Sequence, residues 1–155
     1  MQKKLTPYFL LSFLLILIDQ ISKFAAEANF AEHEFTPVTS FFNLWLVYNP
    51  GAAFIFLANH DGWQRWFFTA LSIAASIFII IQMRSHRAKS LYCLGLAFIL
   101  SGAIGNLIDR VRIGKVVDFL DFYIGNSHWP AFNIADSAIF IGVAILLIDE
   151  FFKRK

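Results

Sequence analysis

Charged residues and cysteines are scarce in this sequence. Only 15% of its 155 residues are charged and 58% are hydrophobic, whereas soluble domains contain about 25% and 45–50% respectively. The single cysteine, Cys93, excludes an internal disulfide and a metal site built from several cysteines. The small net charge of +2 argues against a nucleic-acid partner. The composition indicates one membrane-embedded domain over residues 1–155.

Four long hydrophobic runs account for most of the chain. Runs of 18 to 20 residues, as helices, are long enough to cross a hydrocarbon core of about 30 Å. We expect a four-helix transmembrane bundle, with spans over residues 7–26, 66–83, 91–108 and 134–152. A cleavable signal peptide is the alternative for the first run, because Ala26-Glu27-Ala28 resembles a cleavage site. The three later hydrophobic runs favour a transmembrane span for the first run over a cleavable signal peptide.

The segment between the first two spans, residues 27–64, has strand character in its later part. Residues 44–48 are rich in aromatic and branched side chains, and Asn49-Pro50-Gly51 breaks a helix. Open strand edges are not tolerated in the hydrocarbon core. We therefore expect a small sheet or hairpin at the membrane interface.

Basic residues are concentrated on one side of the predicted topology. Four spans place both termini on that side, together with the loop between the second and third spans. Eight of the thirteen Lys and Arg residues lie there: Lys3, Lys4, Arg84, Arg87, Lys89, Lys153, Arg154 and Lys155. The positive-inside rule makes this side cytoplasmic and the opposite side the outer face.

Four carboxylates are predicted to converge at the outer face. They are Asp19 in the first span, Asp109 after the third, Asp118 in the following connection and Asp136 at the start of the fourth. A charge in a membrane costs roughly 2.5–3.5 kcal/mol, so such a cluster indicates a functional site. The apolar neighbours of Asp118 predict that it is buried, whereas we expect Asp121 on a solvated face.

Asparagines accompany these carboxylates, and a Ser/His or Cys/His pair does not. Asn106 lies on the helix face of Asp109, Asn133 lies on that of Asp136, and Asn49 belongs to the interfacial segment. Two carboxylates in a partly dry site share one proton. The ionised member is then able to activate water for attack on a peptide carbonyl, while the protonated member polarises that carbonyl.

Structural roles are open for some of these residues. Asp19 and Lys23 are four residues apart, so they either form a structural ion pair or line the site. Asp109 either pairs with a basic residue, such as the adjacent Arg110, or acts with Asp136. Asp136 is also suited to the first turn of a helix. Residue patterns alone do not choose between Asp109 and Asp118 as the partner of Asp136.

Five sequence blocks resemble those of the lipoprotein signal peptidase family, also called signal peptidase II. They are Asp19-Gln20-x-x-Lys23, YNPGAAF (48–54), GNLIDR (105–110), VVDF (116–119) and PAFNIADS (130–137). Each block alone is weak, but together they follow the order of the family over essentially the whole chain. The resemblance adds an interfacial β-cradle and a short outer helix to the expected bundle, both within residues 27–64.

The resemblance implies an aspartic endopeptidase of the bacterial inner membrane. Its substrates are prolipoproteins that carry a diacylglyceryl group on the lipobox cysteine, and it cuts on the N-terminal side of that cysteine. The implied enzyme is a monomer among membrane lipids, has both termini in the cytoplasm and its active site at the periplasmic face, and is inhibited by globomycin. It requires no cofactor and no metal.

The resemblance also assigns roles to residues of this chain. Asp118 and Asp136 are the implied catalytic pair. The implied supporting and substrate-binding residues are Asp19, Lys23, Asn49, Gly51, Asn106, Asp109, Arg110, Asn133 and Ala135.

Three other functions are compatible with acids beside membrane spans. A proton-coupled transporter would have acids spread through the bilayer, whereas these gather at one end. A metal-dependent transferase would place closely spaced acidic ligands on one helix. A non-catalytic adaptor leaves the acidic cluster without a role. Insensitivity of the activity to chelators would separate the aspartic mechanism from the metal-dependent one.

Overall fold

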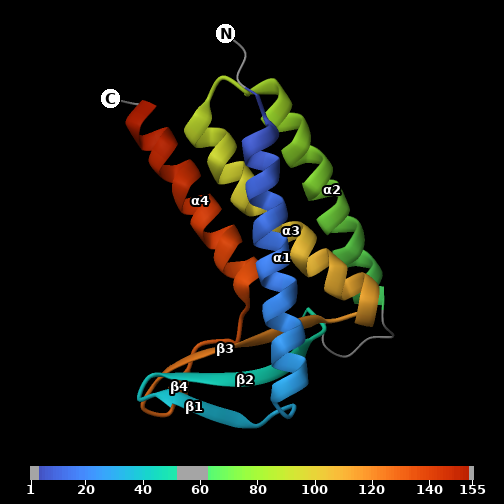
Figure 1. The fold of residues 1–155 in the computed structure, drawn as a ribbon, viewed down its shortest axis with the longest axis vertical. Coiled ribbons are helices and arrows are strands. Elements are labelled where there is room, and N and C mark those ends of the chain that lie inside the picture. Colours follow the sequence, from blue (N-terminus) through green and yellow to red (C-terminus); the bar gives the residue numbers. More distant parts are fainter. Residues whose placement is uncertain (1–3, 52–62, 154–155) are drawn as a thin grey trace.

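The computed structural model describes residues 4–51 and 63–153. Its elements follow in the order α1, β1, β2, α2, α3, β3, β4 and α4. The helices form a bundle, and the strands form one sheet at the end where α1 finishes (Figure 1). The start of α1 and the end of α4 lie at the opposite end of the bundle.

Each predicted hydrophobic run lies within one helix. The helices are α1 (Thr6–Asn29), α2 (Trp63–Ser85), α3 (Ser90–Ile113) and α4 (Ile134–Lys153). The first three are long and apolar enough to cross a membrane. α4 has a similar length, but it carries Asp136 near its start and Asp149 and Glu150 near its end. A membrane-spanning role for α4 therefore stays a prediction.

The outward faces of the helices are apolar. Ile21 on α1 is 65% exposed and Phe140 on α4 is 76% exposed. Exposed side chains of this kind continue along the bundle: Leu10, Phe13, Leu14, Ile18, Leu71, Ile77, Phe78, Ile81 and Leu147. Large contiguous apolar surfaces are unusual on soluble monomers, so this surface is suited to contact with lipid.

α3 packs against each of the other helices and comes closest to α4. A Cβ atom added to Gly102 would lie 2.2 Å from the carbonyl oxygen of Ala135. A Cβ atom added to Gly95 would lie 2.9 Å from the carbonyl oxygen of Gly142. Small residues thus bring the two backbones together. This contact fixes the start of α4, which carries Asp136, against α3.

The sheet is antiparallel, with the strand order β1-β2-β3-β4. The strands are β1 (Phe35–Thr39), β2 (Phe42–Asn49), β3 (Val116–Ile124) and β4 (Ser127–His128). β1 and β2 form the hairpin expected in the interfacial segment. β3 and β4 come from the connection between α3 and α4, which was not predicted to contain strands. The sheet is therefore larger than the β-cradle expected within residues 27–64.

The short outer helix expected between α1 and α2 has no counterpart in residues 30–51. The remainder of its predicted location, residues 52–62, lies outside the described residues.

Candidate active site

A cavity of about 640 Å³ lies where the sheet meets the bundle. It is lined by Trp45, Val47, Tyr48, Asn49, Pro50, Gly51, Phe68, Asn106, Arg110, Val116, Asp118, Pro130, Ala131 and Asp136. Asp118 and Asp136 line this cavity, whereas Asp19 and Asp109 do not belong to its lining. The lining of the cavity therefore combines a pair of carboxylates with mainly apolar surface.

Asp118 reaches the cavity from β3. Its register partner on β2 is Val47, and Asn49 lies two residues further along that strand. Asn49 donates a hydrogen bond through Nδ2 to Asp118 Oδ2 at 3.0 Å, and Asn133 donates through Nδ2 to Oδ1 at 2.7 Å. Burial, and then the negative charge of Asp136, raises the pKa of Asp118 to about 7. Asp118 is therefore able to hold a proton near neutral pH.

Asp136 lies in the first turn of α4, where the chain itself fixes its side chain. The Asn133 backbone N–H donates to Asp136 Oδ2 at 3.3 Å, and the Asp136 backbone N–H donates to Asn133 Oδ1 at 2.9 Å. This reciprocal arrangement is a capping box, which satisfies two backbone donors and starts the helix. Asn106 on α3 donates through Nδ2 to Asp136 Oδ1 at 2.8 Å. Asp136 is thus held from both α3 and α4.

Two asparagines connect the two carboxylates. Asn133 Nδ2 lies 2.7 Å from Asp118 Oδ1 and 3.2 Å from Asn106 Oδ1, while Asn106 Nδ2 bonds Asp136. Within residues 4–51 and 63–153, neither carboxylate forms an ion pair with a Lys or Arg. The pair is therefore oriented by neutral donors and keeps its negative charge.

Lys23 forms ion pairs with the other two carboxylates. Its Nζ lies 2.9 Å from Asp19 Oδ2, 2.8 Å from Asp109 Oδ2 and 3.0 Å from Asn106 Oδ1. All three ammonium N–H groups thus have acceptors, as a buried cation requires. Lys23 is only 1% exposed. The ion pair between Asp19 and Lys23 that their spacing suggested is present, and it extends to Asp109.

The Lys23 cluster, comprising Asp19, Gln20, Lys23 and Asp109, also holds the backbone next to each carboxylate of the pair. Asp109 Oδ2 accepts the backbone N–H of Val117, the residue before Asp118, at 3.1 Å. Asp19 Oδ1 accepts the backbone N–H of Ala135, the residue before Asp136, at 2.8 Å. The cluster therefore positions β3 and α4 relative to α1 and α3.

Gln20 completes this cluster, although sequence reasoning did not select it. Its Nε2 donates to Asp19 Oδ2 at 3.1 Å, to Asp109 Oδ1 at 3.2 Å and to the Gly105 carbonyl at 3.1 Å. Its place directly after Asp19 in the first sequence block was the available signal. Trp45 and Phe68 also line the cavity. They carry no sequence signal that distinguishes them from other aromatic residues.

Arg110 lines the cavity and does not pair with the adjacent Asp109. Its Nη1 lies 3.4 Å from Ser72 Oγ and 3.4 Å from the Asn106 carbonyl, and its guanidinium lies over the Phe68 ring at 5.4 Å. Asp109 points away from the cavity toward Lys23. The alternative that Asp109 pairs with a basic residue is therefore confirmed, but the partner is Lys23 and not Arg110, because successive residues on a helix face different directions.

Gly51 closes the cavity wall beside Asn49. Its φ of 106° is a conformation that glycine adopts readily, and a Cβ atom there would lie 2.4 Å from the Phe68 ring. The Gly51 N–H donates to Asn49 Oδ1 at 2.9 Å. That bond orients the Asn49 amide so that its Nδ2 faces Asp118.

Asp121 is buried, and the expectation of a solvated face is wrong. It is 0% exposed, with Asn43 Nδ2 at 2.9 Å from Oδ2 and His128 Nδ1 at 2.8 Å from the same oxygen. Asn43 is its register partner on β2. The sheet partners that cover Asp121 could not be inferred without knowing that residues 116–124 form a strand.

Within the described residues, no group of three His, Cys, Asp or Glu side chains has the arrangement of metal ligands. Asp19 and Asp109 are both bound to Lys23.

Comparisons of the sequence and of the structure with known proteins agree with each other. The family model described as signal peptidase (SPase) II matches residues 11–152. Lipoprotein signal peptidases from Ralstonia nicotianae and Janthinobacterium sp. are 54% and 56% identical over 144 residues, covering 93% of this chain and 83% and 87% of theirs. A solved structure described as a bacterial membrane enzyme superposes with a TM-score of 0.87 at 27% identity, over 99% of this chain and 93% of that one. A second with the same description gives 0.84 at 29%, over 96% of each chain.

Proposed function

The chain belongs to the signal peptidase II family, and on that premise we propose that it is an aspartic endopeptidase that removes signal peptides from lipid-modified prolipoproteins. The proposed substrate carries a diacylglyceryl group on its lipobox cysteine, and the bond on the N-terminal side of that cysteine is cut. Asp118 and Asp136 are the proposed catalytic residues. Asn49, Asn106, Asn133 and the Lys23 cluster position them.

One observation carries the proposal. Asp118 and Asp136 line the same cavity and are held by asparagine amides, whereas Asp19 and Asp109 share an ion pair with Lys23 outside it. Asp118 is buried and Asp136 is partly buried, and neither has an ion-pair partner among the described residues. Such a pair favours a state with one shared proton. The pair then supplies an acid and a base at the same pH.

The proposed reaction uses the two members of this pair differently. The pKa of Asp118, raised to about 7, supports Asp118 as the protonated member, which donates a hydrogen bond to the scissile carbonyl oxygen. Asp136 as carboxylate takes a proton from water while the water oxygen bonds to the carbonyl carbon. That proton passes to the leaving nitrogen as the C–N bond breaks, giving a free carboxyl group and a free amine.

Neighbouring residues support substrate binding in this scheme. Arg110 lies in the cavity wall beside the pair, where a cation is suited to substrate carbonyl oxygens. Phe68, Trp45 and Val47 provide apolar contact. The apolar outer faces of the helices allow a lipid-bearing substrate to approach sideways through the bilayer.

The proposal fits the expected location of the substrate. Three helices are suited to crossing a membrane, and the cavity lies at the end of the bundle opposite the basic residues Lys4, Arg84 and Arg87. By the positive-inside rule, the cavity then faces the periplasm and the start of α1 faces the cytoplasm. This orientation in a bacterial inner membrane, a fourth span in α4 and action as a monomer are parts of the proposal.

Cleavage by the purified, reconstituted chain tests the proposal. We expect a diacylglyceryl-modified precursor to be cut on the N-terminal side of its cysteine, with inhibition by globomycin and no loss of rate when a chelator is added. The matched control is the same precursor without the lipid. Equal cleavage of both forms would refute the lipid-dependent mechanism, and loss of activity with the chelator would support a metal-dependent enzyme instead.

A further inference from the structure

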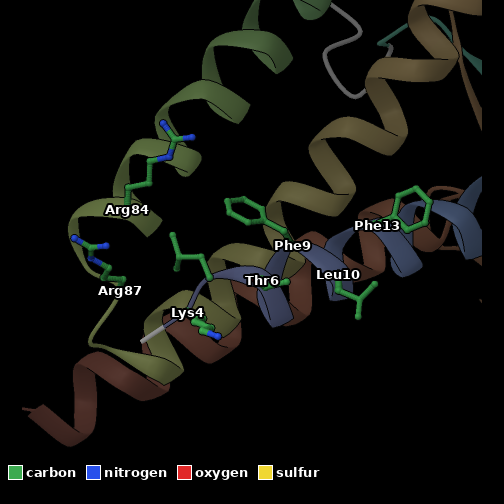
Figure 2. A pocket seen from close by; sticks show the side chains of 8 residues that line it. Lys4, Thr6, Phe9, Leu10, Phe13, Arg84 and Arg87 are labelled. Atoms are coloured by element: carbon green, nitrogen blue, oxygen red, sulfur yellow. The ribbon is translucent and has the colours of Figure 1, made fainter. Parts of the chain in front are cut away.

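A second cavity lies at the end of the bundle away from the sheet. It measures about 970 Å³ and is lined by the start of α1 and the end of α2. Figure 2 shows Arg84 on α2 and Arg87 in the turn that follows α2. Across the cavity lie Lys4, just before α1, and Phe9, Leu10 and Phe13 on α1. We call this space the basic cavity. Its lining combines three cations with an apolar wall.

The cations of the basic cavity lack acidic partners in the part of the chain that the structure describes. Elsewhere, Lys23, Arg112 and Lys153 each form an ion pair with a carboxylate. Lys4, Arg84 and Arg87 form none within residues 4–51 and 63–153. These three cations line one open space, so an anion bound there would complement their charge.

The apolar wall extends from the charged end toward the middle of the membrane. Thr6 and Phe13 both line the cavity, and they lie about 10 Å apart along the axis of α1. Leu10 and Phe13 are 56% and 55% exposed, so their side chains are available to a ligand. Both α1 and α2 are long and apolar enough to cross a membrane, which places their ends at its surface. The cavity therefore has the polarity gradient of a membrane lipid.

We propose that the basic cavity binds one anionic phospholipid. Its phosphate lies among Lys4, Arg84 and Arg87, and one acyl chain lies along Phe9, Leu10 and Phe13. Basic pockets between transmembrane helices on the cytoplasmic side are suited to such head groups. The basic N-terminal region of a signal peptide is excluded from the same space by charge repulsion. This site lies apart from the candidate active site, and lipid binding does not require the peptidase reaction.

A lipid titration of the purified full chain in neutral detergent tests the proposal. Native mass spectrometry counts the lipids retained and gives a dissociation constant for phosphatidylglycerol, with phosphatidylcholine of the same acyl chains as the neutral comparison. Inorganic phosphate is the soluble competitor. Arg87→Gln is compared with Lys89→Gln, because Lys89 is exposed at the same end of the bundle but does not line the cavity.

We expect one phosphatidylglycerol to bind more tightly than phosphatidylcholine and to resist competition by phosphate. Arg87→Gln should weaken its binding about fivefold, and Arg84→Gln with Arg87→Gln about 25-fold, while Lys89→Gln has less than about a twofold effect. Equal binding of the two lipids would overturn the proposal. So would equal weakening by Arg87→Gln and Lys89→Gln, which indicates only diffuse attraction, or full displacement by inorganic phosphate, which indicates a simple anion site.

Discussion

Hydrogen-bond and ion-pair partners divide four aspartates near the sheet end of the bundle into two groups. Asp19 and Asp109 share the ammonium group of Lys23, which neutralises part of their charge. Asp118 and Asp136 receive hydrogen bonds from asparagines, which orient a carboxylate without adding positive charge. Among the described residues, the second group therefore has no Lys or Arg ion-pair partner, which suits its proposed catalytic role, whereas the first group links α1 to α3.

We expect peptidase activity to fall as the pH rises through about 7. Burial and the charge of Asp136 raise the pKa of Asp118 to about 7, so the pair loses its shared proton above that pH. A doubly ionised pair lacks the acid that polarises the carbonyl. The pH profile of kcat/KM on a lipidated precursor checks this, and a rate that stays constant well into the alkaline range would contradict it.

Thermal unfolding of Asp118→Asn provides an independent check on the same pKa. Because the pKa of Asp118 rises from 3.8 to about 7 on folding, the folded protein binds more protons than the unfolded chain between these values. The free energy of unfolding therefore decreases as the pH rises through this window. We expect Tm of the wild type to fall more than that of Asp118→Asn between about pH 5 and about pH 8. Parallel curves would argue against the raised pKa.

Asp109→Asn should lower stability more than it lowers chemistry. The substitution leaves Lys23 with one carboxylate instead of two, and breaking a buried ion pair costs roughly 3–5 kcal/mol. We expect a reduced Tm, with residual cleavage by the enzyme that remains folded. Unfolding and cleavage are measured on the same preparation. A variant of normal stability with no cleavage would identify Asp109, rather than Asp118, as the partner of Asp136.

These residues are recognisable in the sequence, but their contacts are not. The four aspartates were visible as charges beside hydrophobic runs, and the pairing of Asp19 with Lys23 followed from helical spacing. The contact between Lys23 and Asp109 joins two helices far apart in the sequence. No periodicity within one helix predicts such a contact, which is why the choice between Asp109 and Asp118 stayed open without the family resemblance.

At the scale of elements, the pair depends on how β3 and α4 meet α3. Asp118 is presented by β3, Asp136 by the capped start of α4, and Asn106 by α3. The helices were predictable from long apolar runs. β3 was not, although Val116–Ile124 is rich in branched and aromatic side chains, because Asp118 and Asp121 interrupt the apolar pattern of this segment.

Gly105→Ala should disturb the candidate active site by steric overlap with its neighbours, without removing any polar group. A Cβ atom at Gly105 would lie 2.6 Å from Asp19 Oδ2 and 3.2 Å from Ala135 Cβ. Overpacking of this kind costs about 1–3 kcal/mol, and here it also displaces a carboxylate of the Lys23 cluster. We expect both Tm and the cleavage rate per folded molecule to decrease.

Gly95→Ala is the matched control for this change. It introduces the same methyl group on the same helix, against Leu146 and Gly142, about 15 Å along the helix from Gly105. It should lower Tm while leaving the cleavage rate per folded molecule nearly unchanged. An equal loss of rate in both variants would mean that the Lys23 cluster does not position the pair.

At the scale of the whole molecule, the two polar cavities lie at opposite ends of the helix bundle. The carboxylate cavity lies where the helices meet the sheet, and the basic cavity lies at the other end of α1 and α2. Between the two cavities, the outward faces of the helices are apolar. This arrangement suits a membrane enzyme that receives a lipid-bearing substrate at one surface and contacts anionic lipid at the other.

The most direct test of the proposed catalytic pair is single-turnover cleavage of a lipidated precursor by Asp118→Asn and Asp136→Asn in lipid. Asp121→Asn is the matched control, because Asp121 is equally buried on the same strand but does not line the cavity. We predict that each variant of the pair inserts and folds but loses about 10²–10⁴-fold or more in rate. Asp121→Asn should retain most of its activity. Substantial cleavage by either variant of the pair, or an equal loss in Asp121→Asn, would contradict the assignment.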